Sequence, residues 1–99
     1  MPIGVEWQNE GGLTRARYDG PPVEGDHLEL ASPDTVCLRF IDPYGDTTFN
    51  QRQLPILIQE LEALEAVAPE RDAHVVRALL SFLRQARGRV HTYVKFIGD

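Results

Sequence analysis

Apolar residues alternate with polar ones in the first half of the chain, whereas in the second half they recur every three or four positions. Alternation is typical of strands that bury one face, and a spacing of three and four is typical of amphipathic helices. Ile3, Val5 and Trp7 alternate with polar neighbours, and the turn residues 9–12 separate them from a second strand-like segment at 13–18. The pattern therefore predicts a hairpin at the start of the chain.

Three further strands are predicted between residues 27 and 49. Residues 27–31 place Leu28 and Leu30 on one face of a short strand. Residues 35–41 are almost continuously apolar, which favours a central strand buried on both faces. Residues 42–45 follow with Asp, Pro and Gly at the first, second and fourth positions that a type I turn favours. Residues 47–49 would then pair back as a short hairpin arm.

Two consecutive amphipathic helices are predicted next, separated by Pro69. The helical stripes comprise Leu54, Leu57, Ile58, Leu61 and Leu64 in the first helix, and Ala73, Val76, Leu79, Leu80 and Leu83 in the second. The start of the first helix has two interpretations. Asn50 and Gln53 resemble a capping box that would begin the helix at residue 50. Pro55 instead suits the first position of a helix that begins there.

Residues 89–97 alternate again, which predicts a last strand that returns to the sheet. The order β-β-β-β-β-α-α-β indicates a single α+β domain over residues 1–99. We expect a largely antiparallel sheet of about five or six strands with both helices packed on one face. The other face would be open, and its candidate apolar residues are Trp7, Tyr18, Tyr93 and Ile97, although each one singly is better explained as core.

Composition and charge narrow the possible functions. Hydrophobic residues make up 42% of the chain and charged residues 25%, as in soluble globular proteins, and no run approaches the ~20 apolar residues of a membrane span. The net charge of −5 argues against nucleic acid as the main partner. A single cysteine, Cys37, and an N-terminus without secretion-signal features lead us to expect a cytoplasmic protein.

The polar residues that could serve a site gather around the 42–50 segment. The candidate binding residues are Asp42, Tyr44, Asp46, Asn50, His91 and Tyr93. An acid–base pair would combine Asp42 or Asp46 with His91. However, the segment lacks the alternating ligands of a calcium loop, the histidines lack zinc spacing, and no phosphate loop or nucleophile elbow is present. We therefore expect no catalytic residue, no metal and no cofactor.

Arg84, Arg87, Arg89 and Lys95 form the one basic cluster in the sequence. They could make an anion site where the second helix meets the last strand. The favoured interpretation is that they complement the helix dipole and pair with glutamates of the first helix.

The segment FIDPYGDTTFN at residues 40–50 resembles a signature of small bacterial proteins that carry no established activity. The resemblance extends over about residues 36–61 and implies a bacterial cytoplasmic origin. The leading hypothesis for function is a non-catalytic protein–protein interaction module that forms a homodimer, through the open sheet face or the edge of the strand at 89–97. Two alternatives remain: an immunity-type inhibitor of a basic toxin, and a small hydrolase or ligand-binding protein that uses the 42–50 loop.

Overall fold

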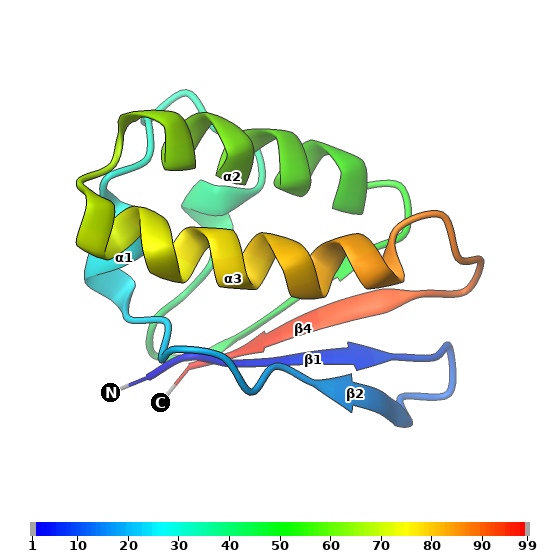
Figure 1. Cartoon of the computed structure of the whole chain (residues 1–99). Coiled ribbons are helices and arrows are strands. Elements are labelled where there is room, and N and C mark those ends of the chain that lie inside the picture. The colour runs from blue at the N-terminus through cyan, green and yellow to red at the C-terminus, as the bar shows by residue number, and fades with distance from the viewer. Residues whose placement is uncertain (1, 99) are drawn as a thin grey trace.

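A computed structural model describes residues 2–98, in which a four-stranded antiparallel sheet carries two long helices on one face (Figure 1). The strands are β1 (Gly4–Gln8), β2 (Thr14–Arg17), β3 (Asp46–Asn50) and β4 (Tyr93–Ile97). The long helices are α2 (Leu54–Val67) and α3 (Glu70–Ala86), and the short helices α1 (Gly25–Glu29) and η1 (Leu38–Phe40, a 3₁₀ turn) precede β3. The predicted α+β class is confirmed. The predicted number of strands is wrong, because the described residues form four strands rather than five or six.

The sheet has the order β2-β1-β4-β3, so the last strand of the chain lies in its centre. Glu6 of β1 stands opposite Lys95 of β4, and Thr48 of β3 stands on the other side of Lys95. Residues opposite one another point to the same face, so these three lie on the open face. The same register places Val5 and Phe96 on the face that the helices cover, where both are buried.

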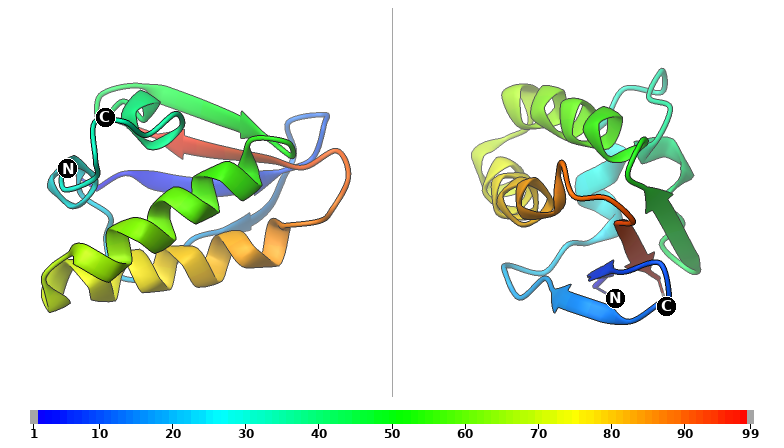
Figure 2. Two further views of the ribbon diagram at one scale, coloured as in Figure 1. Left: turned by 90° about the horizontal axis from the view of Figure 1, so that it is seen from above. Right: turned by 90° about the vertical axis from the view of Figure 1, so that its right-hand side faces the viewer.

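The core lies between that inner face and the two long helices, which run side by side above the sheet (Figure 2). Leu57 and Leu61 of α2 and Leu79 and Leu83 of α3 are fully buried. Burying each leucine contributes roughly 1.5–3 kcal/mol relative to leaving it exposed. The helical stripes predicted from the sequence are therefore the faces that form the core. No helix within residues 2–98 is long and apolar enough to span a membrane.

The start of α2 combines both interpretations of the sequence. The Asn50 side chain accepts hydrogen bonds from the backbone N–H groups of Arg52 and Gln53, and the Gln53 side chain accepts one from the Asn50 N–H. This is the reciprocal pattern of a capping box, but it closes a turn at 50–53. The helix itself begins at Leu54, with Pro55 in its first turn, where a missing N–H costs nothing.

Two predicted strands are wrong. Residues 25–29 form α1, which Glu24 and His27 cap reciprocally, so two alternating leucines at 28 and 30 were too few to indicate a strand. The apolar run at 35–41 contains a loop and η1 instead of a central strand. Its apolar residues divide between the interior and the surface, because Leu38 is buried whereas Val36 and Phe40 are more than half exposed.

The core interpretation, which was favoured for each candidate apolar residue of the open face, is correct for Trp7 and Tyr18. Trp7 is buried on the helix side, and Tyr18 packs edge-to-face on Phe82 of α3. Only Tyr93 and Ile97 of that set lie on the open face, among mostly polar side chains. The last strand begins at Tyr93 rather than residue 89, and β4 pairs on both sides. It therefore cannot offer a free edge to a second chain.

Gly98, directly after β4, fits against the turn at 42–45. Its N–H donates a 2.8 Å hydrogen bond to the carbonyl of Gly45. A Cβ at residue 98 would lie 2.5–2.6 Å from backbone atoms of Asp42 and Gly45, which is closer than any side chain tolerates. The absence of a side chain at Gly98 thus allows the end of the chain to fasten the loop that precedes β3.

We predict that Gly98→Ala lowers the free energy of unfolding by about 1–2 kcal/mol, because the hydrogen bond to Gly45 must break to relieve the overlap. Gly4→Ala is the matched control, since a Cβ there would meet the Ile97 Cβ at an ordinary 3.6 Å. Urea denaturation of both variants measures the difference. Equal stability of the two variants would show that the end of the chain does not fasten this turn.

Candidate functional site

The predicted site residues lie at two opposite ends of the sheet. Asp46 stands opposite Ile97, the last residue of β4, and Asn50 stands opposite Tyr93, the first. Asp42 and Tyr44 belong to the turn beside Asp46. The two ends are separated by the length of β4, about 13 Å for four residue steps.

The 42–45 turn is held by its own polar groups. The Asp42 carboxylate accepts a 2.8 Å hydrogen bond from the Tyr44 N–H, and the Asp42 carbonyl accepts one from the Gly45 N–H. The Tyr44 side chain is 82% exposed. Asp46 pairs with Lys95 across the open face at 3.3 Å. Asp42 is thus engaged within the turn, as turn chemistry predicts, whereas Asp46 is engaged in an ion pair with a neighbouring strand.

His91 lies at the other end of the sheet, in the loop before β4. Its backbone φ is +55°, a conformation that residues other than glycine rarely adopt, and its N–H donates to the Gln51 side chain. Its Nδ1 lies 3.0 Å from a carboxylate oxygen of Glu10. The structure therefore brings His91 to Glu10 and not to Asp42 or Asp46, and the acid–base pair considered from the sequence has no geometric basis.

Other groups with potential chemistry do not assemble into a reactive site. No three potential ligands among His, Cys, Asp and Glu of residues 2–98 come together as a metal site. Burial raises the pKa of the Cys37 thiol, and the nearby charge of Glu60 raises it further. A thiol with a raised pKa is a poor nucleophile, because the thiolate is the reactive form.

One histidine–carboxylate pair was not anticipated from the sequence. His27 Nε2 lies 3.8 Å from the carboxylate of Asp72, a residue buried at the start of α3. His27 Nδ1 accepts a 2.9 Å hydrogen bond from the Glu24 N–H. One ring nitrogen therefore caps α1, and the other faces Asp72. The pair fastens α1 to α3, and its 45-residue separation in sequence left no local signal.

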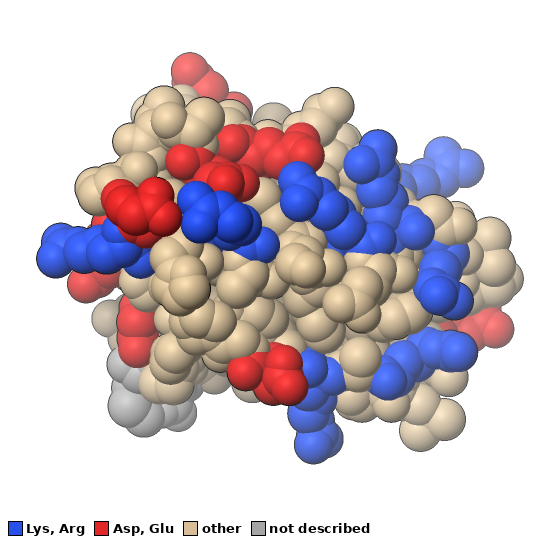
Figure 3. All heavy atoms as spheres, in the orientation of Figure 1, with Lys and Arg blue, Asp and Glu red and all other residues tan. Residues whose placement is uncertain are grey.

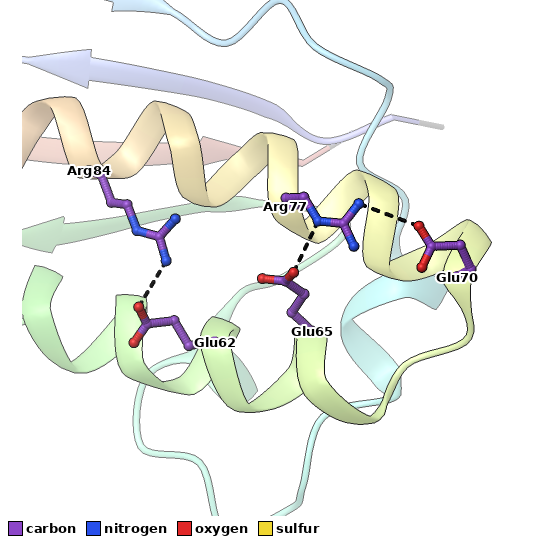
Figure 4. A network of polar contacts seen from close by, with 5 residues as sticks. All are labelled: Glu62, Glu65, Glu70, Arg77 and Arg84. Carbon is purple, nitrogen blue, oxygen red and sulfur yellow. Dashed lines mark hydrogen bonds and ion pairs between the residues drawn. The ribbon is translucent and has the colours of Figure 1, made fainter.

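Charged side chains also join the two long helices. Arg84 pairs with Glu62 at 2.8 Å, and Arg77 bridges Glu65 and Glu70 at 3.0 and 3.4 Å (Figure 4). The favoured interpretation of the basic cluster, pairing with glutamates of the first helix, is thus correct for Arg84. Because most of these side chains are about half exposed or more, water screens the pairs and each contributes little to stability.

The carboxylate of Glu60 on α2 holds the segment that was mistaken for a central strand. It accepts hydrogen bonds of 2.5, 3.0 and 3.0 Å from the backbone N–H groups of Val36, Cys37 and Leu38. These three consecutive N–H groups would have bonded to a neighbouring strand in a sheet. A single side chain therefore fixes residues 36–38 against the flank of α2.

Both α2 and the segment attached to it carry exposed apolar side chains. Val36 and Phe40 come from the attached segment, with 54% and 59% of their surfaces exposed. Ile56 and Val67 lie on α2, four residues before and seven after Glu60, and are 40% and 76% exposed. Positions separated by four and seven residues share one side of a helix. We call Val36, Phe40, Ile56 and Val67 the α2 surface.

Two clefts adjoin the α2 surface, one on each side of residues 31–35. The first has a volume of about 370 Å³ between that loop and α2, and its walls include Ala63, Leu64 and Val67. The second, of about 390 Å³, lies toward α1 and includes Leu28, Leu38 and Ile41. Thr35 borders both clefts, and its buried hydroxyl oxygen has no hydrogen-bond partner among residues 2–98. No local pattern in the sequence indicates these clefts, since they form between segments far apart in the chain.

The chain matches no protein-family model, no curated protein and no solved structure in the three comparisons made.

We predict that Glu60→Gln lowers the free energy of unfolding by about 1–3 kcal/mol, because an amide replaces an acceptor of charge-assisted hydrogen bonds. Glu62→Gln on the same helix is the control and should cost less than about 1 kcal/mol, as its one partner is the exposed Arg84. Chemical denaturation compares the two variants. A Glu60→Gln variant as stable as the control would mean that the carboxylate does not hold the 36–38 segment.

We predict that Cys37 reacts with a chromogenic disulfide reagent at pH 8 roughly tenfold or more slowly in the native protein than in guanidinium chloride. Burial keeps the thiol protonated and shielded in the folded chain. Since Cys37 is the only cysteine, the absorbance change reports on it alone. Equally fast reaction before and after unfolding would contradict the assignment of a buried, inert thiol.

Proposed function

We propose that this protein is a non-catalytic interaction module that self-associates through the α2 surface. The observation that carries the proposal is that four exposed apolar side chains lie on α2 and on the segment fastened to it, and that two clefts with apolar walls border these elements. An apolar patch of this kind on a small protein is typical of an association site. The absence of converging reactive groups in residues 2–98 is the reason for preferring binding over catalysis.

A second copy of the chain is the partner that the α2 surface suits. A two-fold interface uses the same patch on both subunits, so the patch must carry both projections and hollows. Val36 and Val67 supply projections, and the cleft walled by Ala63 and Leu64 supplies a hollow of the size of a few apolar side chains.

Charges around the surface are consistent with this pairing. Arg39 stacks on Phe40 with its guanidinium carbon 4.9 Å from the ring centroid, and has no carboxylate partner within residues 2–98. Asp34 borders the cleft on α2, and its carboxylate forms no ion pair in that part of the chain. A two-fold arrangement could place Arg39 of one copy against Asp34 of the other, which would fix the register of the dimer.

The dimer would not use the strand edges expected from the sequence. Because β4 is central, the edges of the sheet are β2 and β3. β2 has four residues, two of which are arginines, and charged side chains on a short edge strand oppose pairing with another chain. On β3, the Thr47 hydroxyl bonds to the backbone of Phe40 and Asp42, so the loop before the strand covers part of that edge.

Sedimentation velocity over roughly 1–300 µM tests the proposal, with a species of twice the 11.2 kDa chain mass as the expected result. Phe40→Asp and Val67→Asp should each raise the dissociation constant at least about tenfold, because a charge would have to be buried in the interface. Leu13→Asp is the control, since Leu13 is 69% exposed in the β1–β2 turn, away from this surface.

Circular dichroism of each variant verifies that the chain is folded. A wild-type chain that remains monomeric throughout, or a control that dissociates as readily as the two surface variants, would contradict self-association. The inhibitor of a basic toxin, which the net charge of −5 favours, would then be the next interaction to test.

A further inference from the structure

A pocket of about 320 Å³ lies at the end of the sheet opposite to the 42–45 turn. Its walls come from β1, β2 and the loop between α3 and β4, and consist of Trp7, Arg15, Arg89, Val90, His91 and Thr92. Basic side chains gather at this end of the molecule, around the C-terminal end of α3 and the β1–β2 hairpin (Figure 3). The pocket is thus a basic site on a chain whose net charge is −5.

Two arginines from distant parts of the chain meet at one indole ring in this pocket. The guanidinium carbons of Arg15 and Arg89 lie 5.9 and 5.1 Å from the centroid of the Trp7 ring. Such cation–π contacts position a guanidinium while leaving its N–H edge available. Trp7 is 91% buried, so the ring is a fixed platform for both side chains.

Neither guanidinium has an acidic partner within residues 2–98. Arg89 Nε donates to the Gln85 carbonyl at 3.2 Å, and no other hydrogen bond of its guanidinium is found there. The Arg15 guanidinium makes the contact with Trp7 and no hydrogen bond. By contrast, Arg17, the next arginine of β2, pairs with Glu6 at 3.2 Å. The guanidinium N–H donors of Arg15 and Arg89 therefore remain available to a bound acidic group from outside residues 2–98.

The negative groups near the pocket either have a partner already or carry only a partial charge. The carboxylate of Glu10 lies against His91 at 3.0 Å. The C-terminal end of α3 carries only the partial negative charge of its carbonyl groups. Two like charges held near one ring repel each other, and an oxyanion between them would remove this repulsion. Guanidinium groups bind carboxylate and phosphate oxygens in pairs, which suits them to that role.

We propose that this pocket binds the oxyanion group of a small molecule, a carboxylate or a phosphate, between Arg15 and Arg89. The volume is at the lower end of the range for small-molecule sites, roughly 300–1,000 Å³, so the ligand is compact. The members of the basic cluster identified in the sequence therefore have different roles. Arg84 and Lys95 are paired with acidic side chains, whereas Arg89 lines the pocket together with Arg15. The site is separate from the α2 surface, and neither proposal depends on the other.

Trp7 is the only tryptophan, so its fluorescence reports directly on the pocket. The experiment titrates inorganic phosphate and, separately, citrate into the protein, with potassium chloride added to hold the ionic strength constant. We expect a saturable change in fluorescence in the millimolar range with at least one of the two anions. Saturation by phosphate alone or by citrate alone identifies which oxyanion the pocket prefers.

Arg15→Gln and Arg89→Gln should each weaken binding about tenfold or more, since each removes charge-assisted hydrogen bonds. Arg71→Gln is the control, because Arg71 is 90% exposed at the opposite end of α3 and belongs to neither proposed binding site. Its affinity for the anion should equal that of the wild type. Thermal unfolding verifies that each variant is folded. Because Arg15 is exposed on an edge strand, Arg15→Gln tests the proposal even if Arg89→Gln disturbs the end of α3.

Backbone amide shifts of residues 89–92, followed by nuclear magnetic resonance during the same titrations, detect binding that leaves the fluorescence unchanged. The proposal is overturned if neither measurement saturates with either anion. It is equally overturned if Arg15→Gln binds as tightly as the wild type and the Arg71→Gln control. Neither result would bear on self-association, which sedimentation measures independently.

Discussion

The fold depends on β4, because within residues 2–98 it is the only strand that joins the N-terminal hairpin to β3. Residues 4–8 pair with residues 93–97 on one side, and residues 46–50 pair with the same strand on the other. The sheet is incomplete until nearly the whole chain has been ordered. Pairing over such a distance in sequence costs loop-closure entropy, which the core beneath α2 and α3 must offset.

The loops and short helices around this sheet are held in place by a few polar side-chain and backbone contacts rather than by further strands. Gly98 fastens the 42–45 turn, Glu60 fastens residues 36–38, and His27 links α1 to Asp72 of α3. The contacts of Gly98 and Glu60 satisfy backbone N–H groups that would otherwise be unpaired on removal from water. The long segment between β2 and β3 can therefore pack on the helices with only α1 and η1 as its regular secondary structure, and it brings Val36 and Phe40 to the surface.

The two proposed binding surfaces follow from this architecture and differ in chemistry. The α2 surface is apolar because the segment that Glu60 holds presents both faces of an apolar run, one to the core and one to solvent. The pocket at Trp7 is basic because a hairpin and a helix end, nearly 75 residues apart, each bring an arginine to one buried ring. The proposed anion site is thus basic on an acidic chain, and the proposed protein-binding surface, which is separate from it, is apolar.

The sequence by itself determined the α+β class, both long helices, the hairpin and the alternation of β4, because these depend on local periodicity and on punctuation by Pro69 and Gly88. It also indicated the turn at 42–45, whose Asp42 bonds within the turn. Only the tertiary structure decided that residues 35–41 avoid the sheet, since Glu60, more than twenty residues away, supplies the acceptors for their N–H groups. Likewise, the register of β4 decided that His91 lies far from Asp42, because strand pairing is a long-range contact that local patterns do not encode.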